Sequence, residues 1–215
     1  DTAEKCRAKG ALVSTHVVDV TDRDAMKEWI TSIDRQTPID LVIANAGISG
    51  GTGTAGEDFD QVRALFKVNV DGVFNTIEPA LPLMRQRGRG QIAIMSSLAG
   101  YRGWPGAPAY CASKAAVKVY GEALRGCVSD QGIYTSVICP GFIKSPMTDV
   151  NNYKMPFLIS SEKAARIIAR GLEKNKGRIS FPWQTAFFAS LISCMPDSIA
   201  QICLSRTPAK PELYV

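Results

Sequence analysis

The chain has 215 residues, of which 46% are hydrophobic and 21% charged, and this is enough for one globular domain with a substantial core. The net charge is +5, but apart from residues 84–90 the basic residues are dispersed, which does not predict a nucleic-acid-binding face. Six cysteines without Cys-x-x-Cys spacing argue against a zinc site and predict reduced, mostly buried thiols in a cytoplasmic protein. The single histidine, His16, falls in an apolar strand-like pattern, where we expect a structural role and no metal.

Helical and strand-like patterns alternate along the chain, which predicts a parallel sheet with helices on both faces. In the first half, the pattern predicts a helix to about Lys9 and a strand over Leu12–Val18. A helix over Asp22–Arg35, capped by Thr21 or Asp22, and a strand over Asp40–Ala44, buried on both faces, are expected next. A helical region over Glu57–Arg87, interrupted near Pro79, completes this half. The second half predicts strands over Gln91–Ser96, Ile133–Cys139 and Arg178–Phe181, and helices from Tyr110 to Asp130 and over Ser160–Asn175 with Ser160 as N-cap.

Three polar or turn-forming positions follow successive predicted strands at their carboxyl ends. Asn45, Ser97 and Pro140 each stand where a buried apolar run stops. Ligands of open α/β sheets bind at this edge, so we expect these positions to line a common site. After Asn45, the small residues Ala46 and Gly47 allow a ligand to approach the backbone closely.

Tyr110 and Lys114 are the most informative pair in the sequence. They stand four residues apart in a predicted helix and therefore lie on the same face. A neighbouring ammonium favours the phenolate, so we expect the pKa of Tyr110 to be lowered, as suits a general acid/base. Ser97 stands thirteen residues upstream and offers a hydroxyl for a substrate oxygen. Taken alone, the pair also fits a solvated surface contact, and the serine fits a helix cap or turn.

The order of several motifs resembles that of the short-chain dehydrogenase/reductase family. The matching stretches are DVTD at 19–22, NAG at 45–47, VNVDGVFN at 68–75, SSLAG at 96–100, YCASK at 110–114 and PGFIKSPMT at 140–148. The resemblance implies a Rossmann-type doubly wound parallel sheet and a catalytic set of Asn69, Ser97, Tyr110 and Lys114. In that set Tyr110 is the acid/base, Lys114 lowers its pKa and holds the nicotinamide ribose, Ser97 orients the carbonyl, and Asn69 anchors a water of the proton relay.

The same resemblance implies NAD or NADP as cofactor, with hydride passing to or from its nicotinamide ring. The implied contacts are Asp19, Val20, Asn45, Ala46, Gly47, Tyr110, Lys114, Pro140, Gly141, Ile143 and Ser145. Two positions keep alternatives. Asp19 equally fits the N-cap of the next helix, and Asn69, unfavourable inside a helix, also fits a buried amide that caps a neighbouring loop.

The chain departs from the family pattern at its beginning. The family opens with a strand and a Gly-rich turn that receives the pyrophosphate at a helix N-terminus, and no such segment stands before Asp1. We therefore expect that this N-terminal βαβ portion is missing here and that the working molecule has a segment before Asp1. The sequence GTGTAG at 51–56 matches G-x-G-x-x-G but follows the NAG turn, and we interpret it as a loop near the cofactor.

Residues 1–215 are expected to form one N-terminally incomplete dinucleotide-binding domain, in which 181–215 is an apolar C-terminal extension. Its uncharged run, Trp183 to Met195, is too short to span a bilayer and is followed by Pro196. This run has three possible roles: a lid over the substrate, a subunit interface or an interfacial membrane helix. The first two are favoured because no basic polar face accompanies the run. Homodimers or homotetramers are usual in the family.

The leading hypothesis is an NAD(P)-dependent oxidoreductase acting on a secondary alcohol or ketone, the small-molecule substrate being apolar. The alternatives are a catalytically inactive binding or scaffold protein that retains the fold, and an isomerase or epimerase that uses the same Tyr–Lys pair. The missing phosphate-binding turn favours the scaffold if the chain is complete. The intact catalytic set favours the oxidoreductase.

Overall fold

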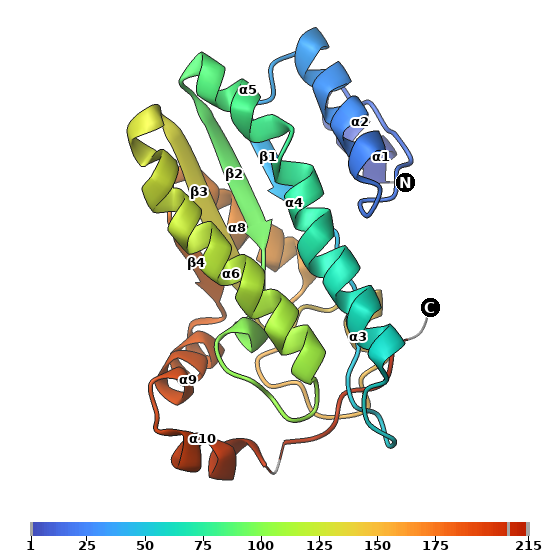
Figure 1. The fold of residues 1–215 in the computed structure, drawn as a ribbon, viewed down its shortest axis with the longest axis vertical. Helices are drawn as coiled ribbons and strands as arrows, with labels where there is room; N and C mark the ends of the chain where they lie inside the picture. Colours follow the sequence, from blue (N-terminus) through green and yellow to red (C-terminus); the bar gives the residue numbers. More distant parts are fainter. Residues whose placement is uncertain (1, 206, 214–215) are drawn as a thin grey trace.

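In the computed structural model, which describes residues 2–205 and 207–213, a single four-stranded parallel sheet forms the centre of the molecule (Figure 1). Its strands are β1 (Leu41–Ala44), β2 (Gly90–Met95), β3 (Ile133–Pro140) and β4 (Arg178–Phe181), in the spatial order β1-β2-β3-β4. All neighbouring strands run parallel, so their carboxyl ends share one edge of the sheet. This confirms the predicted Rossmann-type α/β class.

The helices are α1 (Thr2–Arg7), α2 (Arg23–Gln36), α3 (Phe59–Phe66), the π-helix η1 (Lys67–Asp71), α4 (Gly72–Ile77), α5 (Ala80–Arg87), the 3-10 turns η2 (Leu98–Gly100) and η3 (Ser129–Gln131), α6 (Pro108–Val128), α7 (Pro146–Asp149), α8 (Ser161–Glu173), α9 (Trp183–Ser193) and α10 (Asp197–Leu204). In Figure 1, α4, α5 and α6 cover one face of the sheet and α8 lies behind the other. The helix α2 packs outside α4 and α5.

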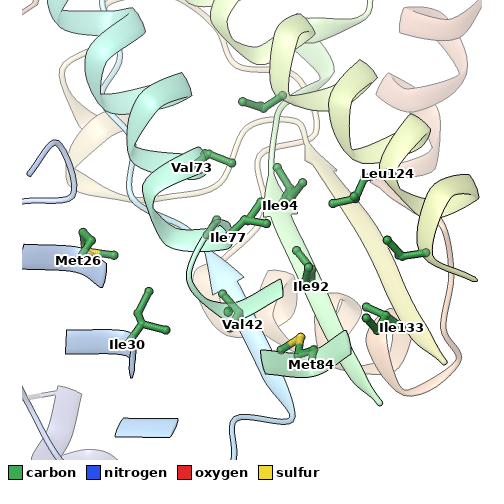
Figure 2. Close-up of a cluster of buried hydrophobic side chains, with 14 of the residues drawn as sticks. Met26, Ile30, Val42, Val73, Ile77, Met84, Ile92, Ile94, Leu124 and Ile133 are labelled. Atoms are coloured by element: carbon green, nitrogen blue, oxygen red, sulfur yellow. The ribbon is translucent and has the colours of Figure 1, made fainter. Parts of the chain in front are cut away.

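Two hydrophobic clusters hold these layers together, because side chains alternate between the faces of each strand. The larger cluster joins Ile92 and Ile94 of β2 to α2, α4 and α6, and Figure 2 shows Met26 and Ile30 of α2 approaching it from the side. Ala93 of β2 points the other way, into a smaller cluster with α8 and β4. The sheet is thus anchored on both faces, and the loops at its carboxyl edge rest on a rigid base.

Most local predictions agree with the structure. Asp22 caps α2 by accepting a hydrogen bond from the Ala25 amide at 3.0 Å, and Ser160 caps α8 through the Lys163 amide at 3.3 Å. The long helical region breaks around Pro79, between α4 and α5, as expected. These elements depend on contacts within a few residues, which is why their boundaries can be read locally.

The predicted strand over Leu12–Val18 is wrong. Residues 11–19 form no regular structure, and Leu12 and Val17 are fully exposed at 104% and 100%. An apolar alternation becomes a strand only where a neighbouring strand accepts its backbone hydrogen bonds. Among the described residues no strand lies beside this segment, so the pattern remains unpaired.

The first strand is also less buried than predicted. In β1, Val42 and Ala44 are buried, whereas Leu41 and Ile43 are 40% and 44% exposed. β1 lies at one edge of the sheet, and α4 packs against it on one face. A strand is buried on both sides only where other elements cover both of its faces, and among the described residues β1 is covered on one face.

The expectation of mostly buried cysteines is also wrong. Cys111 and Cys139 are buried, but Cys6, Cys127, Cys194 and Cys203 are exposed, and all six are free thiols. His16 is exposed and outside any strand, with its ring stacked on Trp29 at a centroid distance of 5.7 Å. Apolar neighbours in sequence do not ensure burial where the segment lies outside the packed layers.

Candidate active site

The carboxyl edge of the sheet brings together three of the predicted positions. Asn45 directly follows β1, Ser97 follows β2 by two residues, and Pro140 ends β3. The Ser97 hydroxyl reaches the Pro140 carbonyl at 3.5 Å, which places the ends of β2 and β3 in contact. Parallel register alone accounts for this convergence, as predicted from the sequence.

Helix α6 supplies the predicted Tyr–Lys pair. It begins at Pro108, whose missing amide costs nothing at the first helical position, and it carries Tyr110 and Lys114 one turn apart. The Lys114 ammonium lies 5.9 Å from the centre of the Tyr110 ring. The Ser96 hydroxyl donates to the Lys114 carbonyl at 2.7 Å, so the end of β2 is fastened to α6 at the pair.

Ser97 has a structural role beside any chemical one. Its side chain caps η2 by accepting a hydrogen bond from the Ala99 amide at 3.1 Å. Ser97 also hydrogen-bonds the Tyr110 hydroxyl and thereby lowers the pKa of that phenol. The cap and the contact with Tyr110 coexist, because a hydroxyl both donates and accepts.

The predicted lowering of the Tyr110 pKa is wrong for this structure. Burial raises the pKa of Tyr110 above its usual value, and hydrogen bonds from Ser97 and Ser49 oppose that rise only in part. The sequence argument considered the charge of Lys114 and omitted the cost of placing a phenolate in a site with little water.

Lys114 is itself buried, with 4% of its surface exposed. Desolvation and the nearby Lys210 lower its pKa to about 8. Within the described part of the chain, its ammonium has one hydrogen-bond acceptor, the Met95 carbonyl at 3.1 Å. An ammonium has three donors, so two remain for a bound ligand.

Asn69 lies at the centre of the π-helix η1 and is fully buried. Its amide accepts a hydrogen bond from the Ile48 backbone at 2.9 Å and donates to the Ile48 carbonyl and the Ser113 hydroxyl, each at 3.0 Å. The widened turn of a π-helix directs this side chain toward the loop after β1. The side chain therefore holds the loop, which was the second of the two interpretations from the sequence. The relay role stays a prediction.

The NAG turn packs directly on η1 and α6 at Asn69 and Lys114. Asn45 and Ala46 are exposed, whereas a side chain at Gly47 would come within 3.1 Å of both the Asn69 amide oxygen and the Lys114 ammonium. A larger residue at this position would therefore force the Asn69 and Lys114 side chains to shift, because the loop approaches η1 and α6 closely.

The predicted adenine-side residues lie on the loop before α2. Asp19 is exposed and accepts a hydrogen bond from the Thr21 amide at 2.8 Å, which lowers the pKa of its carboxyl. It does not cap α2, since Asp22 does, so that alternative is wrong. Val20 packs against the larger core cluster, and its carbonyl accepts from the Asn75 amide at 2.9 Å.

The loop after β3 holds the remaining predicted cofactor contacts. The Gly141 amide donates to the Phe181 carbonyl at 2.7 Å, and Ile143 forms a parallel bridge with Ile159. Ser145 forms a capping box with Thr148 at the start of α7. The loop is therefore well anchored beside the end of β3, where the resemblance places the carboxamide.

Two functional candidates were missed from the sequence. Ser49 hydrogen-bonds Tyr110, and the Lys210 ammonium lies over the Tyr110 ring, 4.4 Å from its centre. The position of Ser49 two residues after the NAG turn was a usable signal. Lys210 offered none, because it is remote from every motif.

The GTGTAG segment is a loop, as predicted. Its Gly53 amide donates to the Lys210 carbonyl at 2.9 Å, and the helix after it, α3, begins with Asp58 as N-cap and Asp60 in its first turn. Two carboxylates at a helix N-terminus occupy the position where a phosphate would bind and would repel it. This segment does not fit a pyrophosphate.

The nicotinamide side of a dinucleotide does fit the residues present. The two remaining donors of the buried Lys114 suit ribose hydroxyls, and a Cβ at Gly47 would fill the space that the NAG turn leaves beside that ammonium. Among residues 2–205 and 207–213, no group of three or more His, Cys, Asp or Glu side chains is placed to hold a metal ion.

Comparisons with known proteins identify the family of this chain. Residues 1–155 match the family described as short chain dehydrogenase. An uncharacterized oxidoreductase of Myxococcus xanthus is 36% identical over 204 residues, which cover 94% of this chain and 81% of that protein. The chain belongs to the short-chain dehydrogenase family, whose members are oxidoreductases that use nicotinamide cofactors.

Other relatives are longer than the matching region. The 17-beta-hydroxysteroid dehydrogenase 13 of Mus musculus is 30% identical over 186 residues, which cover 85% of this chain and 61% of that protein. A gluconate 5-dehydrogenase from Burkholderia cenocepacia, solved in complex with NADP and tartrate, is similar with a TM-score of 0.64 and 26% identity. That similarity covers 68% of this chain and 58% of the gluconate enzyme.

None of the helices in the described ranges is both long and apolar enough to cross a membrane. The run from Trp183 forms α9 of 11 residues and is separated from α10 at Pro196, as the sequence predicted. The cytoplasmic location stays a prediction.

Proposed function

We propose that this protein is an NAD(P)-dependent oxidoreductase that interconverts a secondary alcohol and a ketone, with Tyr110 as the acid/base. The observation that supports this most is the placement of a buried ammonium, Lys114, one helical turn from a phenol that also contacts the Ser97 hydroxyl. These groups converge at the carboxyl edge of a parallel sheet, where ligands of this architecture bind.

In the reduction direction, the Ser97 hydroxyl donates a hydrogen bond to the substrate carbonyl and orients it. As a C–H bond forms at the carbonyl carbon, the C=O π electrons move onto oxygen, and the Tyr110 O–H bond breaks to give that oxygen its proton. Lys114 stabilises the phenolate that remains. When bound, the reduced nicotinamide supplies the hydride and is oxidised. The reverse sequence oxidises an alcohol, with Tyr110 taking the proton.

The residues that would hold the cofactor are those the family motif marks. Lys114 has free donors for the ribose, the NAG turn offers exposed Asn45 and Ala46, and the loop from Pro140 to Ser145 lies beside the end of β3. Asp19 is exposed, which suits a contact with adenine. Either NAD or NADP is compatible with these contacts.

An apolar substrate is supported by an aromatic cluster beside the acid/base. The ring of Tyr153 lies edge-on to Trp104 at 6.0 Å and to Phe142 at 6.2 Å. Desolvation and proximity to Tyr110 raise the pKa of Tyr153 to about 12. The name of the mouse relative, a hydroxysteroid dehydrogenase, agrees with a bulky apolar alcohol or ketone.

The apolar C-terminal helices support assembly into a homodimer or homotetramer. On α9, Trp183, Phe187 and Phe188 are 73%, 59% and 55% exposed, and on α10 Ile202 is 71% exposed. Large apolar side chains gathered in this way usually mark a contact surface. We include this interface in the proposal.

The first experiment is a calorimetric titration of the purified protein with NADH and with NADPH, followed by turnover assays on secondary alcohols and ketones. Tyr110→Phe should bind cofactor and lose at least about a hundredfold in kcat, since general acid/base catalysis contributes that much or more. Tyr134→Phe, on the exposed side of β3, is the matched control and should retain activity. Full activity in Tyr110→Phe would refute the proposed acid/base. Absence of binding to both cofactors would favour a scaffold that retains the fold without catalysis.

A further inference from the structure

The segment after α10 returns to the active site and is fastened there by its backbone. We call residues 207–213 the C-terminal strap. The Lys210 amide donates to the Gly106 carbonyl at 3.2 Å, and the Leu213 amide donates to the Gln61 side chain at 2.6 Å. Together with the Gly53 bond described above, these contacts fix the strap against the loops at the carboxyl edge of the sheet.

The side chain of Lys210 enters the site at the acid/base. Only 9% of Lys210 is exposed, and its ammonium lies 4.4 Å from the centre of the Tyr110 ring, closer than Lys114 at 5.9 Å. The same ammonium hydrogen-bonds the Ser49 hydroxyl, which in turn bonds to Tyr110. Lys210 therefore contacts the ring of Tyr110 directly and is linked to its hydroxyl through Ser49.

This ammonium is buried without a carboxylate. Among the described residues, its polar contacts are Ser49 and the π-face of Tyr110. Desolvation lowers the pKa of Lys210 to about 8, so at pH 7 it remains mostly protonated. An unpaired buried cation is costly unless an anion forms beside it. The anion that the proposed reaction creates at this point is the Tyr110 phenolate.

We propose that Lys210 is a second active-site cation, which acts with Lys114 to stabilise the Tyr110 phenolate when the phenol gives up its proton. This rests on the proposed function of Tyr110. In a reduction the phenol O–H bond breaks, its proton goes to the substrate oxygen, and the charge left on the ring faces two ammonium groups. In an oxidation the same cations favour the phenolate that accepts the proton.

Other groups also face Tyr110 and remain unchanged in the test. Lys114 and Cys111 come from α6, Ser97 from the end of β2, Ser49 from the loop after β1, and Tyr153 from the segment after α7. Glu57 lies near Cys111 and accepts a hydrogen bond from the Ala109 amide at 2.9 Å. Only the charge of Lys210 is to be varied against this background.

The experiment is a spectrophotometric titration of tyrosinate at 295 nm without cofactor. Subtracting the Tyr110→Phe curve isolates the titration of Tyr110. Lys210→Met removes the charge and keeps the length of the side chain, whereas Lys210→Arg retains the charge. Lys118→Met is the matched control, because the Lys118 ammonium lies over a different ring, Tyr101, at 5.4 Å.

We expect the Tyr110 midpoint to fall by about one to two pH units in Lys210→Arg, because a guanidinium stays charged at the pH where Tyr110 ionises, whereas the Lys210 ammonium, with a pKa of about 8, is largely neutral there. The midpoint should stay near the wild-type value in Lys210→Met and in Lys118→Met. With cofactor and substrate at pH 7, where the Lys210 ammonium is charged, kcat should fall by at least about tenfold in Lys210→Met, and this loss should shrink as the pH rises past 8. An unchanged Tyr110 midpoint in Lys210→Arg would overturn the proposal and leave Lys210 as an anchor of the strap.

Two points keep the outcome decisive. If Lys210→Met does not fold, as judged by circular dichroism, Lys210→Gln is the second neutral variant, and it retains a donor for Ser49. The cofactor-free titration is also independent of turnover. If Tyr110→Phe proves active, the proposed function fails, while the effect of Lys210 on the Tyr110 titration is still measured.

Discussion

Two buried lysines, Lys114 and Lys210, make the stability of this protein depend on pH. In the folded state the pKa of each is lowered to about 8, with burial as the main cause, from an ordinary value of 10.5. Between these two values the unfolded chain binds more protons than the folded protein. The free energy of unfolding therefore rises with pH across this range.

The magnitude follows from the two pKa values. Going from pH 7 to pH 9, each lysine adds about 1 kcal/mol to the free energy of unfolding. Cys139 acts in the opposite sense, because burial raises its pKa from 9.0 to about 11, but its effect develops mainly above pH 9 and subtracts less than about 0.5 kcal/mol by then. The expected net gain is about 2 kcal/mol.

The assay is urea unfolding followed by circular dichroism at pH 7, 8 and 9, with a constant slope m as the test that the same transition is compared. In Lys210→Met the gain should fall by at least half, because Lys210 also contributes to the lowered pKa of Lys114. Lys118→Met should keep the wild-type gain. A free energy of unfolding that is flat or falls between pH 7 and 9 would refute the burial of two charged lysines.

Two further predictions concern η1 and the C-terminal helices. Asn69→Ala should lower the free energy of unfolding by about 2–4 kcal/mol in urea titrations, because it leaves the Ile48 amide and carbonyl without their partners. A loss below about 1 kcal/mol would mean that contacts other than those of Asn69 hold the loop after β1. Phe187→Asp should shift sedimentation toward a smaller species, because a charge at the exposed face of α9 opposes apolar association. Unchanged sedimentation would exclude α9 as the interface.

Local patterns in the sequence were sufficient for most of the fold and for the centre of the site. The i, i+4 spacing of Tyr110 and Lys114 and the runs that end at Asn45, Ser97 and Pro140 are properties of short stretches. Helix and strand periodicity therefore predicts where these side chains emerge. Because parallel strands share one carboxyl edge, the convergence of three strand ends could be anticipated without knowing any long-range contact.

The tertiary structure alone decided what depends on neighbours distant in sequence. Leu12–Val18 has the pattern of a strand but no partner, and β1 lies at an edge where one face is uncovered. The pKa of Tyr110 is set by its desolvation, which the spacing of Lys114 does not reveal. Lys210 reaches Ser49 across 161 residues of chain. Pairing, burial and the approach of a remote cation are determined by how the layers and the strap pack, and these contacts leave no periodic signal in the sequence.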